Sequence, residues 1–389
     1  MPTTPMPGLD SAVRQQSPEP HRTVRADVAI IGAGPAGLAA AIHLGQLGLG
    51  RVVLCDRADF PRDKTCGSAI SPRGIDVLAG LGVKEKVLSR SYQISGMRLV
   101  TPRRHELVLS GHTDVAAICC RRIFDHLLLD RAQETGSTFL PRFHASFLLQ
   151  KGDQVVGVRA SDGREVQADY TIVADGAHSR LTRERGSRRL IQAIMGWWED
   201  VPFRPNHIDM VFDDLFTPLY GWLFPEGPTR VNIGICYEDP GRSHNARELF
   251  AAFLDKHYGA QLRDGRQAGT LQGHPISYST RIGKLASPGR LVIGEAGRLT
   301  HPATAEGIYQ GMRSGMLAAE ALHGILKQGQ APTMAFGRYE RACRKAFGVS
   351  FLGALAWRRF VSIGGLDTMV SAAKRPFAQR LLARGMARM

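Results

Sequence analysis

The sequence predicts an α/β protein with a discontinuous, doubly wound parallel-sheet domain, an inserted antiparallel-sheet domain and a helical C-terminal region. Residues 26–34 are a β-branched apolar run that ends in glycines, which indicates a buried strand. Residues 35–47 begin with proline and continue with alanine and leucine, which is typical of a helix. A second apolar run, 51–56, completes a strand–helix–strand unit. Aromatic-rich, strand-like segments occupy 193–279, and 290–294 returns to the first pattern.

The other expected elements complete this division of the chain. They are helices at 72–81 and 121–135, strands at 147–158 and 165–173 with a turn at Ser161-Asp162-Gly163, and a long helix at 307–326. The first 25 residues are rich in Pro, Ser and Thr, so we expect a disordered leader. We assign residues 26–95, 116–186 and 280–330 to the first domain, 96–115 and 187–279 to the inserted domain, and 331–389 to a basic helical C-terminal region.

The composition is that of a globular protein. Apolar residues make up 43% of the 389 positions, and no apolar run reaches the roughly 18 residues of a membrane-spanning helix. None of the six cysteines forms a CxxC pair or a Cys/His spacing typical of zinc. We therefore expect no metal site and no disulfide, and a cytoplasmic protein.

The net charge of +15 is the compositional outlier, and much of it lies near the C-terminus. Residues 341–389 contain ten bases and one acid, Asp367, interleaved with Phe, Leu and Trp. Such a mixture suits an anionic membrane surface or an acidic partner better than nucleic acid. The alternative is an arginine-rich helical face in water. We expect no nucleic-acid binding and leave membrane contact open.

A glycine motif follows the first strand and opens the first helix. In Gly32-x-Gly34-x-x-Gly37, the three glycines allow a tight turn, close approach of a pyrophosphate, and close packing of helix on strand. The helix begins with Pro35 and Ala36, and its N-terminus favours phosphate. Asp56, about 20 residues further on, suits a ribose diol and would repel the 2′-phosphate of NADP. The motif therefore predicts a Rossmann-like domain that binds FAD or NAD.

Further motifs resemble those of FAD-dependent aromatic hydroxylases and their relatives. Residues 170–183 resemble the group's strand-turn signature, and residues 290–308 resemble its second FAD motif. The helix that contains Arg122, Phe124 and Asp125 resembles one whose arginine contacts FAD. The resemblance favours FAD over NAD. With the glycine motif it implies these cofactor-binding residues: Gly32, Gly34, Pro35, Ala36, Gly37, Asp56, Arg57, Arg122, Asp175, Gly176, Gly294, Glu295, Pro302, Gly307 and Ile308.

Within this superfamily the chain resembles the geranylgeranyl reductase family. Residues 60–67 resemble its Lys-x-Cys-Gly segment, and residues 220–234 match its substrate-domain signature. The resemblance implies that Tyr220, Trp222, Phe224 and Cys66 bind a hydrophobic substrate. Cys66 and His301 are the candidate catalytic residues, as substrate contact or proton donor. Three positions depart from the family pattern: Glu295 replaces Asp, and Ala305 and Cys236 replace glycines.

Three functions remain open from the sequence. The resemblance favours a reductase that transfers hydride from FAD to a C=C bond of a polyprenyl-like or natural-product substrate, with NAD(P)H or another donor as transient reductant. The first alternative is a monooxygenase that hydroxylates or epoxidises an aromatic or polyketide-like compound. The second is a non-catalytic FAD-binding protein on a membrane surface. A halogenase is more distant, because no segment resembles the Trp-x-Trp-x-Ile-Pro motif.

Overall fold

The computed structural model describes residues 23–110, 116–182 and 189–373. Most of the expected leader, residues 1–25, lies outside this part of the chain. Residues 23–25 are not leader, because they already belong to the first strand, β1 (Thr23–Ile31), and pair with β11. The start of the first domain therefore lies a few residues earlier than the apolar pattern predicts.

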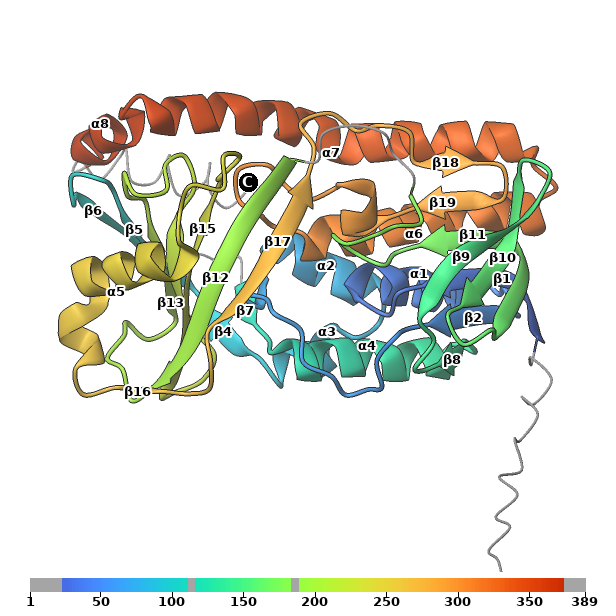
Figure 1. The fold of residues 1–389 in the computed structure, drawn as a ribbon, viewed down its shortest axis with the longest axis horizontal. Coiled ribbons are helices and arrows are strands. Elements are labelled where there is room, and N and C mark those ends of the chain that lie inside the picture. Colours follow the sequence, from blue (N-terminus) through green and yellow to red (C-terminus); the bar gives the residue numbers. More distant parts are fainter. Residues whose placement is uncertain (1–22, 111–115, 183–188, 374–389) are drawn as a thin grey trace, which may run out of the picture.

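A mostly parallel sheet forms the right half of the molecule in Figure 1. Its strands lie in the order β18 (Ala286–Ser287), β19 (Arg290–Val292), β11 (Glu165–Val173), β1, β2 (Val52–Cys55) and β8 (Thr138–Leu140). All of these strands except β18 pair in parallel. A hairpin of β9 (Ala145–Lys151) and β10 (Gln154–Ala160) extends the sheet beside β11. The single strand expected at 147–158 is wrong, because a turn with Gly152 at φ +60° splits it.

Helices cover one face of this sheet. They are α1 (Pro35–Gln46), α2 (Pro72–Gly80), α3 (Lys84–Leu88), α4 (Arg121–Glu134) and α6 (Ile308–Leu326), preceded by the short 3₁₀ helix η1 (Gly294–Gly297). Val28 and Ile30 of β1 face these helices, whereas Ala29 and Ile31 face a second core that includes the hairpin residue Val158. The expectation of a doubly wound sheet is therefore corrected, since hairpin and loop residues cover the second face in the described part of the chain.

A second, mixed sheet forms the left half of the molecule (Figure 1). Its order is β16 (Arg266–Gln267), β12 (Arg189–Glu199), β15 (Arg230–Tyr237), β14 (Gly221–Pro225), β13 (His207–Val211), β5 (Gly96–Val100) and β6 (Glu106–Ser110), and β17 (Gln272–Tyr278) also pairs with β12. The pairs are antiparallel except β13 with β5, which is parallel, so the expectation of an antiparallel sheet is corrected to a mixed one. Helix α5 (Ala246–Leu262) packs on one face.

A small third sheet connects the two halves. It consists of β3 (Ala69–Ile70), β7 (Ala116–Ile118) and β4 (Tyr92–Ile94). Ile70 packs in the core of the first sheet, whereas Ile94 and Ile118 pack in the core of the second. The two large sheets are therefore joined by continuous apolar packing.

The C-terminal helices lie across both sheets. Helix α7 (Pro332–Ser362) runs along the upper edge of the molecule in Figure 1, and α8 (Gly365–Ala372) follows it. Phe347 and Phe351 of α7 pack in the core of the first sheet, whereas Val361 packs in the core of the second. Within the described residues no single helix meets the length and hydropathy of a membrane span; only the bent pair α7 and α8 does so together. Because α7 contributes side chains to the cores of both sheets, it is an integral part of the fold.

Candidate cofactor and substrate site

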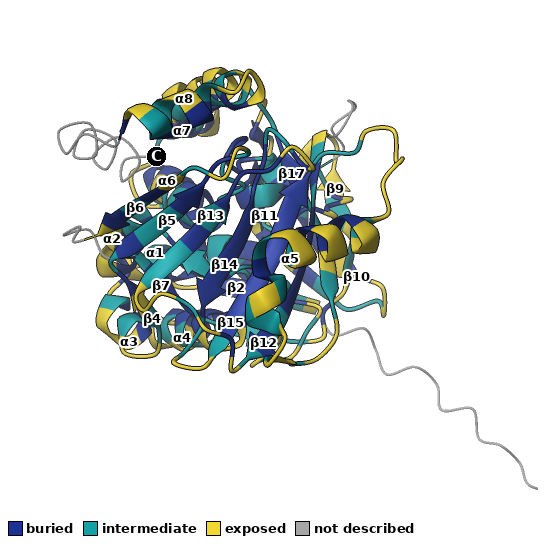
Figure 2. Ribbon diagram, turned by 90° about the vertical axis from the view of Figure 1, so that its left-hand side faces the viewer, coloured by how far each residue is buried: buried dark blue, intermediate teal, exposed yellow. Residues whose placement is uncertain are grey.

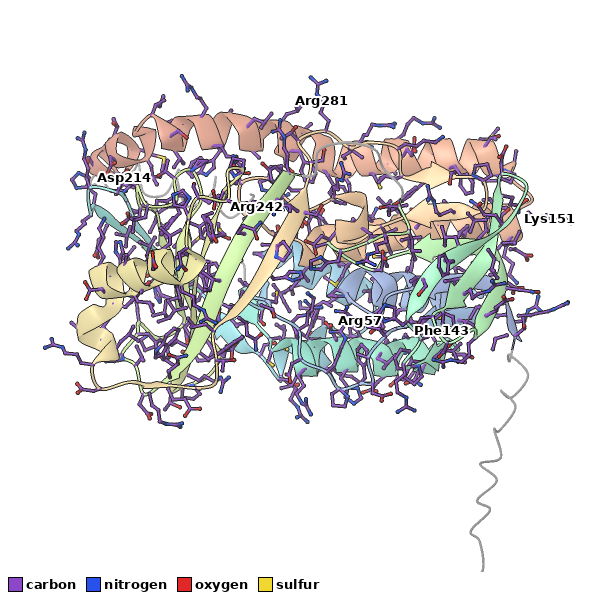
Figure 3. The ribbon with its side chains drawn as sticks, viewed as in Figure 1. Arg57, Phe143, Lys151, Asp214, Arg242 and Arg281 are labelled. Carbon is purple, nitrogen blue, oxygen red and sulfur yellow. The ribbon has the colours of Figure 1, made fainter. Side chains whose placement is uncertain are left out.

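One large cavity lies between the two sheets. Its volume is about 1680 Å³, which exceeds the roughly 300–1,000 Å³ of an ordinary small-molecule pocket. The glycine loop after β1, which includes Gly32 and Gly34, lines one end of the cavity. Arg57 and Phe143, which are labelled in Figure 3, also line the cavity. The other end is lined by Tyr220 and further apolar side chains of the second sheet. The cavity is large enough to hold a dinucleotide and a second ligand together.

The glycine loop fits a pyrophosphate. A Cβ on Gly32, whose φ is +103°, would lie 2.4 Å from the carbonyl oxygen of Ala174, and one on Gly37 would lie 1.9 Å from that of Gly32. Close packing within the protein therefore requires glycine at both positions, even without a ligand. In front of Gly34 the nearest atom to such a Cβ is a guanidinium nitrogen of Arg121, 4.0 Å away. The open space at Gly34 faces the cavity, where a phosphate could approach the backbone.

Asp56 lies at the end of β2 and lines the same end of the cavity. Its Oδ2 accepts a 2.7 Å hydrogen bond from the N–H of Ala33, and its Oδ1 accepts one of 2.9 Å from the N–H of Ala58. These bonds hold the carboxylate beside the glycine loop. The position agrees with the expected contact to a ribose diol.

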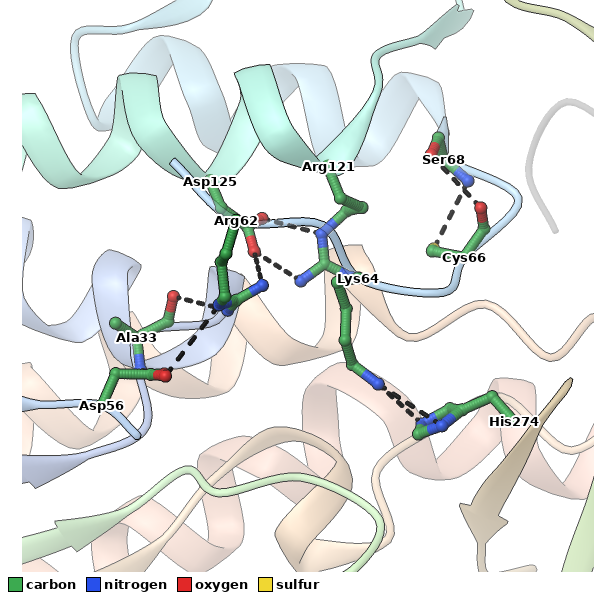
Figure 4. Close-up of polar contacts among 9 residues, drawn as sticks. All are labelled: Ala33, Asp56, Arg62, Lys64, Cys66, Ser68, Arg121, Asp125 and His274. Atoms are coloured by element: carbon green, nitrogen blue, oxygen red, sulfur yellow. Dashed lines mark hydrogen bonds and ion pairs between the residues drawn. The ribbon is translucent and has the colours of Figure 1, made fainter. Parts of the chain in front are cut away.

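Two arginines converge on one buried aspartate beside the glycine loop (Figure 4). Arg121 at the start of α4 donates two 2.7 Å hydrogen bonds to the carboxylate of Asp125, one turn further along the helix. Arg62 lies 3.0 Å from the same carboxylate and donates to the carbonyl oxygen of Ala33 at 3.1 Å. The Asp125 carboxylate raises the pKa of Arg121 despite its burial. The cavity therefore has a fixed positive group near Gly34, where a phosphate would bind.

Arg122, the expected cofactor contact, does not lie at the cavity. Its side chain is 54% exposed and pairs with Asp63 at 3.4 Å. The structure corrects the expectation to the neighbouring residue, because Arg121 is the one that lines the cavity. On a helix a shift of one residue turns the side chain by about 100°, so the motif alone placed the arginine on the wrong face.

A lysine–histidine pair in the lining of the cavity joins the loop after β2 to the second sheet (Figure 4). The Lys64 ammonium lies 3.0 Å from Nε2 of His274, which is on β17. Burial, with the nearby positive charge of Lys64, lowers the pKa of His274 to about 3. Burial and Arg121 also lower the pKa of Lys64. His274 is therefore neutral at pH 7 and accepts the hydrogen bond.

The remaining residues of the two expected FAD motifs meet at the C-terminal ends of β11 and β19. Asp175, Gly176, Glu295, Gly307 and Ile308 all line the cavity. Burial raises the pKa of Glu295, and its Oε1 accepts a 2.9 Å hydrogen bond from the N–H of Ser277 on β17. The side chain of Glu295, which replaces the aspartate of the family pattern, therefore contacts a strand of the second sheet.

Three expected residues shape the site without lining it. Gly294, at φ +58°, leaves room for Ala36 of α1, because a Cβ would lie 2.9 Å from that methyl group. The carbonyl oxygen of Pro302 accepts a 3.0 Å hydrogen bond from Arg358 of α7. Gly37 packs against the glycine loop as described above. Each of these three positions is therefore held by a contact within the protein.

His301, a candidate catalytic residue, is also absent from the lining of the cavity. Its ring is buried and packs edge-on against Phe351 of α7, with 5.8 Å between ring centroids. Its Nδ1 accepts a 3.2 Å hydrogen bond from the N–H of Thr304. Burial lowers its pKa to about 4. His301 therefore holds the loop before α6 in place and does not face the cavity, and its expected catalytic role stays a prediction.

The apolar end of the cavity is lined by alternate residues of the strand β14 and the residue before it. The rings of Tyr220 and Trp222 are 6.3 Å apart, and those of Trp222 and Phe224 are 5.8 Å apart. Cys66 lines the cavity next to Gly67, where a Cβ would lie 3.2 Å from the Phe224 ring. The structure thus brings together all four residues expected to contact a substrate.

The two residues that replace glycines of the family pattern also lie at the apolar end of the cavity. Cys236 is buried beside Tyr220, and its Sγ donates to the carbonyl oxygen of that residue at 3.2 Å. Ala305 has φ +54°, a backbone conformation in which a side chain is strained. Both residues line the cavity, so their side chains reduce the space available to a ligand.

Several residues of the site were not assigned a role from the sequence, although Arg62 and Lys64 lie in the segment 60–67 discussed above. These are Arg62, Arg121, Lys64 and His274, with Asn232, which hydrogen-bonds the indole of Trp222. The Arg121–Asp125 spacing of four residues on one helix was a usable signal. Lys64 and His274 are separated by 210 residues, so no local pattern connects them.

Comparisons with known proteins agree with this geometry. The family described as FAD binding domain matches residues 25–227. The menaquinone reductase of Mycobacterium tuberculosis is 30% identical over 384 residues, covering 92% of this chain and 91% of that protein. The digeranylgeranylglycerophospholipid reductase of Methanocella arvoryzae is 25% identical, covering 83% and 84%.

Solved structures share the fold. A geranylgeranyl bacteriochlorophyll reductase-like protein from Thermoplasma acidophilum gives a TM-score of 0.81 at 22% identity, covering 90% of this chain and 91% of that one. A flavin-dependent brominase gives 0.78 at 20% identity, covering 94% of both chains. At this identity the likeness concerns the fold alone. From the family match and the menaquinone reductase relatives, the chain belongs to the FAD binding domain family and is an FAD-dependent oxidoreductase.

Proposed function

We propose that this protein reduces a C=C bond in a long apolar substrate of polyprenyl type. The observation that carries the proposal is the continuity of the cavity, which runs from the glycine loop to the aromatic end at Tyr220, Trp222 and Phe224. The names of the relatives, a menaquinone reductase and a digeranylgeranylglycerophospholipid reductase, support a substrate with a prenyl chain. The first sheet would bind the cofactor, and the second sheet would bind the substrate.

The residues of the chain have separate roles in this proposal. The glycine loop, Asp56 and Arg121 would hold the FAD, which supplies hydride chemistry when it is bound. Tyr220 and Trp222 would hold the apolar chain and exclude water from it. Cys66 lies where the aromatic end meets the rest of the cavity, and its thiol is the proposed proton donor or substrate contact.

The electron donor would be NAD(P)H or another transient reductant. Arg180 and His178 line the cavity and would supply cationic or hydrogen-bonding groups for a second nucleotide. Because such a donor must leave after it reduces the flavin, we propose weak, reversible binding. Rapid-mixing absorbance at 450 nm with NADH, NADPH and dithionite would identify the productive reductant.

The reaction type is tested by product mass. The purified holoenzyme is reduced without oxygen and mixed with a menaquinone or with geranylgeraniol, and the product is analysed by mass spectrometry. A gain of two hydrogens in geranylgeraniol supports the reductase, and so does a gain in menaquinone that persists after air has reoxidised the quinol to the quinone. A product that appears only after oxygen is admitted and gains one oxygen atom would establish the monooxygenase alternative. Flavin reoxidation by oxygen with no product from any of the substrates would favour the non-catalytic alternative.

A further inference from the structure

The outward face of α7 carries exposed apolar side chains. Val349 is 82% exposed, Leu352 59%, Leu355 40%, and Ile363, directly after the helix, 64%. Their spacing of three, three and eight residues places them along one face of the helix. The opposite face is buried and includes Phe347 and Phe351. In Figure 2, α7 and α8 form the top of the molecule, with exposed residues outward.

Four bases share this outward face. Arg338, Arg341, Lys345 and Arg359 are exposed, and their spacing of three, four and fourteen residues places them on the same side as Leu352. None of the four forms an ion pair with a residue in the described ranges, whereas the other two bases of α7, Arg344 and Arg358, pair with Glu340 and Glu238. We call these four bases and the four apolar residues the outer stripe.

The outer stripe has no negative charge. The single acid of α7 is Glu340, and its Oε1 faces the sheet, where it accepts a 2.9 Å hydrogen bond from the N–H of Leu285. The helix of 31 residues is about 46 Å long, so the stripe presents an extended positive and apolar surface. Bases alone would allow binding to any polyanion. Exposed Leu and Val side chains, however, stabilise a complex only if binding removes them from water.

The same helix covers the apolar end of the cavity. Trp357, on the inner side of α7, lies 6.4 Å from the ring of Phe212, and Phe212 lies 6.0 Å from the ring of Tyr220. Phe360 of α7 packs in the same cluster. A surface bound to the outer stripe would therefore lie on the opposite side of α7 from Trp357, which is linked through Phe212 to Tyr220, one of the residues expected to hold the substrate.

We propose that the outer stripe of α7 lies flat on an anionic lipid bilayer. The four bases would contact lipid phosphates, and the apolar residues would enter the boundary between headgroups and acyl chains. This inference concerns the partner and does not depend on the reaction, because binding to vesicles is measured without turnover. Failure of either proposal is thus recognised separately.

The test compares two triple variants of the full-length holoprotein that lose the same charge. Arg341→Gln/Lys345→Gln/Arg359→Gln changes the outer stripe, and Arg242→Gln/Arg247→Gln/Arg263→Gln changes exposed bases beside or on α5. Sedimentation is measured with vesicles of phosphatidylcholine containing about 30% phosphatidylglycerol at low salt. We expect the outer-stripe variant to bind roughly tenfold or more weakly than wild type, and the α5 variant to bind like wild type.

A second pair isolates the apolar part. Val349→Ser/Leu352→Ser should weaken vesicle binding several-fold, even in salt that screens the bases, whereas Ile123→Ser/Leu215→Ser, which changes exposed apolar residues elsewhere, should not. Equal weakening by both charge variants would show that net charge alone attracts the protein and would overturn the proposal. So would unchanged binding of both outer-stripe variants. Duplex DNA bound as tightly as the vesicles, and lost in the same charge variant, would overturn it in favour of nucleic acid.

Deleting residues 360–389 would not answer the question. Such a deletion removes Val361, Leu366 and Val370 from the core of the second sheet. It also removes Asp367, which accepts a hydrogen bond from the hydroxyl of Thr101. Lower vesicle binding after truncation would therefore be confounded by unfolding, which is why exposed side chains are changed instead.

Discussion

The indole Nε1–H of Trp222 donates a 2.7 Å hydrogen bond to Oδ1 of Asn232 on the neighbouring strand β15. Asn232 is fully buried, and its Nδ2 donates to the carbonyl oxygen of Gly196 at 3.2 Å. A Cβ on Gly234 would lie only 2.2 Å from the indole, so glycine there is required by the ring. Asn232 is therefore a positioning residue that fixes how Trp222 faces the cavity.

Asn232→Ala should destabilise the protein and weaken substrate binding while FAD remains bound. The change leaves the Trp222 N–H without its partner, at a cost of about 1–3 kcal/mol in the free energy of unfolding. Urea unfolding, flavin absorbance and KM are measured together. Trp222→Phe removes the indole N–H itself, so in that background Asn232→Ala should raise KM much less. A rise in KM equal to that in wild type would contradict a role for Asn232 through Trp222.

The purified protein should be yellow with non-covalent FAD, and Gly34→Val should abolish FAD binding. The valine side chain would enter the open space in front of the loop, where a phosphate approaches the backbone. Gly50→Val is the matched control, because a Cβ there meets nothing within 4 Å. The flavin released from each protein by heat is quantified by fluorescence. Normal FAD content in Gly34→Val would refute the placement of the pyrophosphate.

Tyr220→Ala and Trp222→Ala should impair substrate binding or turnover and leave the flavin spectrum nearly unchanged. Both side chains belong to the second sheet and line the apolar end of the cavity. Because each ring is buried, the truncation also costs about 3–5 kcal/mol in the free energy of unfolding, so activity is measured well below the melting temperature. Loss of FAD from a folded variant would show that this end of the cavity contacts the cofactor.

His301→Gln should reduce the acid sensitivity of folding without abolishing activity. Burial lowers the pKa of His301 from 6.5 to about 4, so between these pH values the unfolded chain binds a proton that the folded protein does not. The free energy of unfolding contributed by this group is therefore complete above pH 6.5 and falls as the pH drops toward 4. Urea unfolding at pH 7, 6 and 5 should show a shallower decline in the variant. Complete loss of turnover with normal stability would restore His301 as a catalytic residue.

Local patterns in the sequence determined the cofactor half of this protein. The strand, the three glycines and Asp56 lie within 31 residues, and short-range sterics decide each of them: a Cβ on Gly32 or Gly37 collides with the backbone. The order of the elements, the return to the first sheet at β19, and the four cavity-lining residues expected to contact a substrate also followed from the chain. The boundaries of strands that are separated by a single tight turn did not follow from the sequence, as the turn at Gly152 between β9 and β10 shows.

Only the tertiary structure decided which polar groups meet in the cavity. Arg121 rather than Arg122 faces it because the packing of α4 sets which side of the helix is buried. The Lys64–His274 pair requires both sheets to be in place, and His301 is removed from the cavity by α7, which covers it from a distant part of the chain. The outer stripe of α7 became visible in the same way. Its periodicity is present in the sequence, but which face is exposed depends on what the other face packs against.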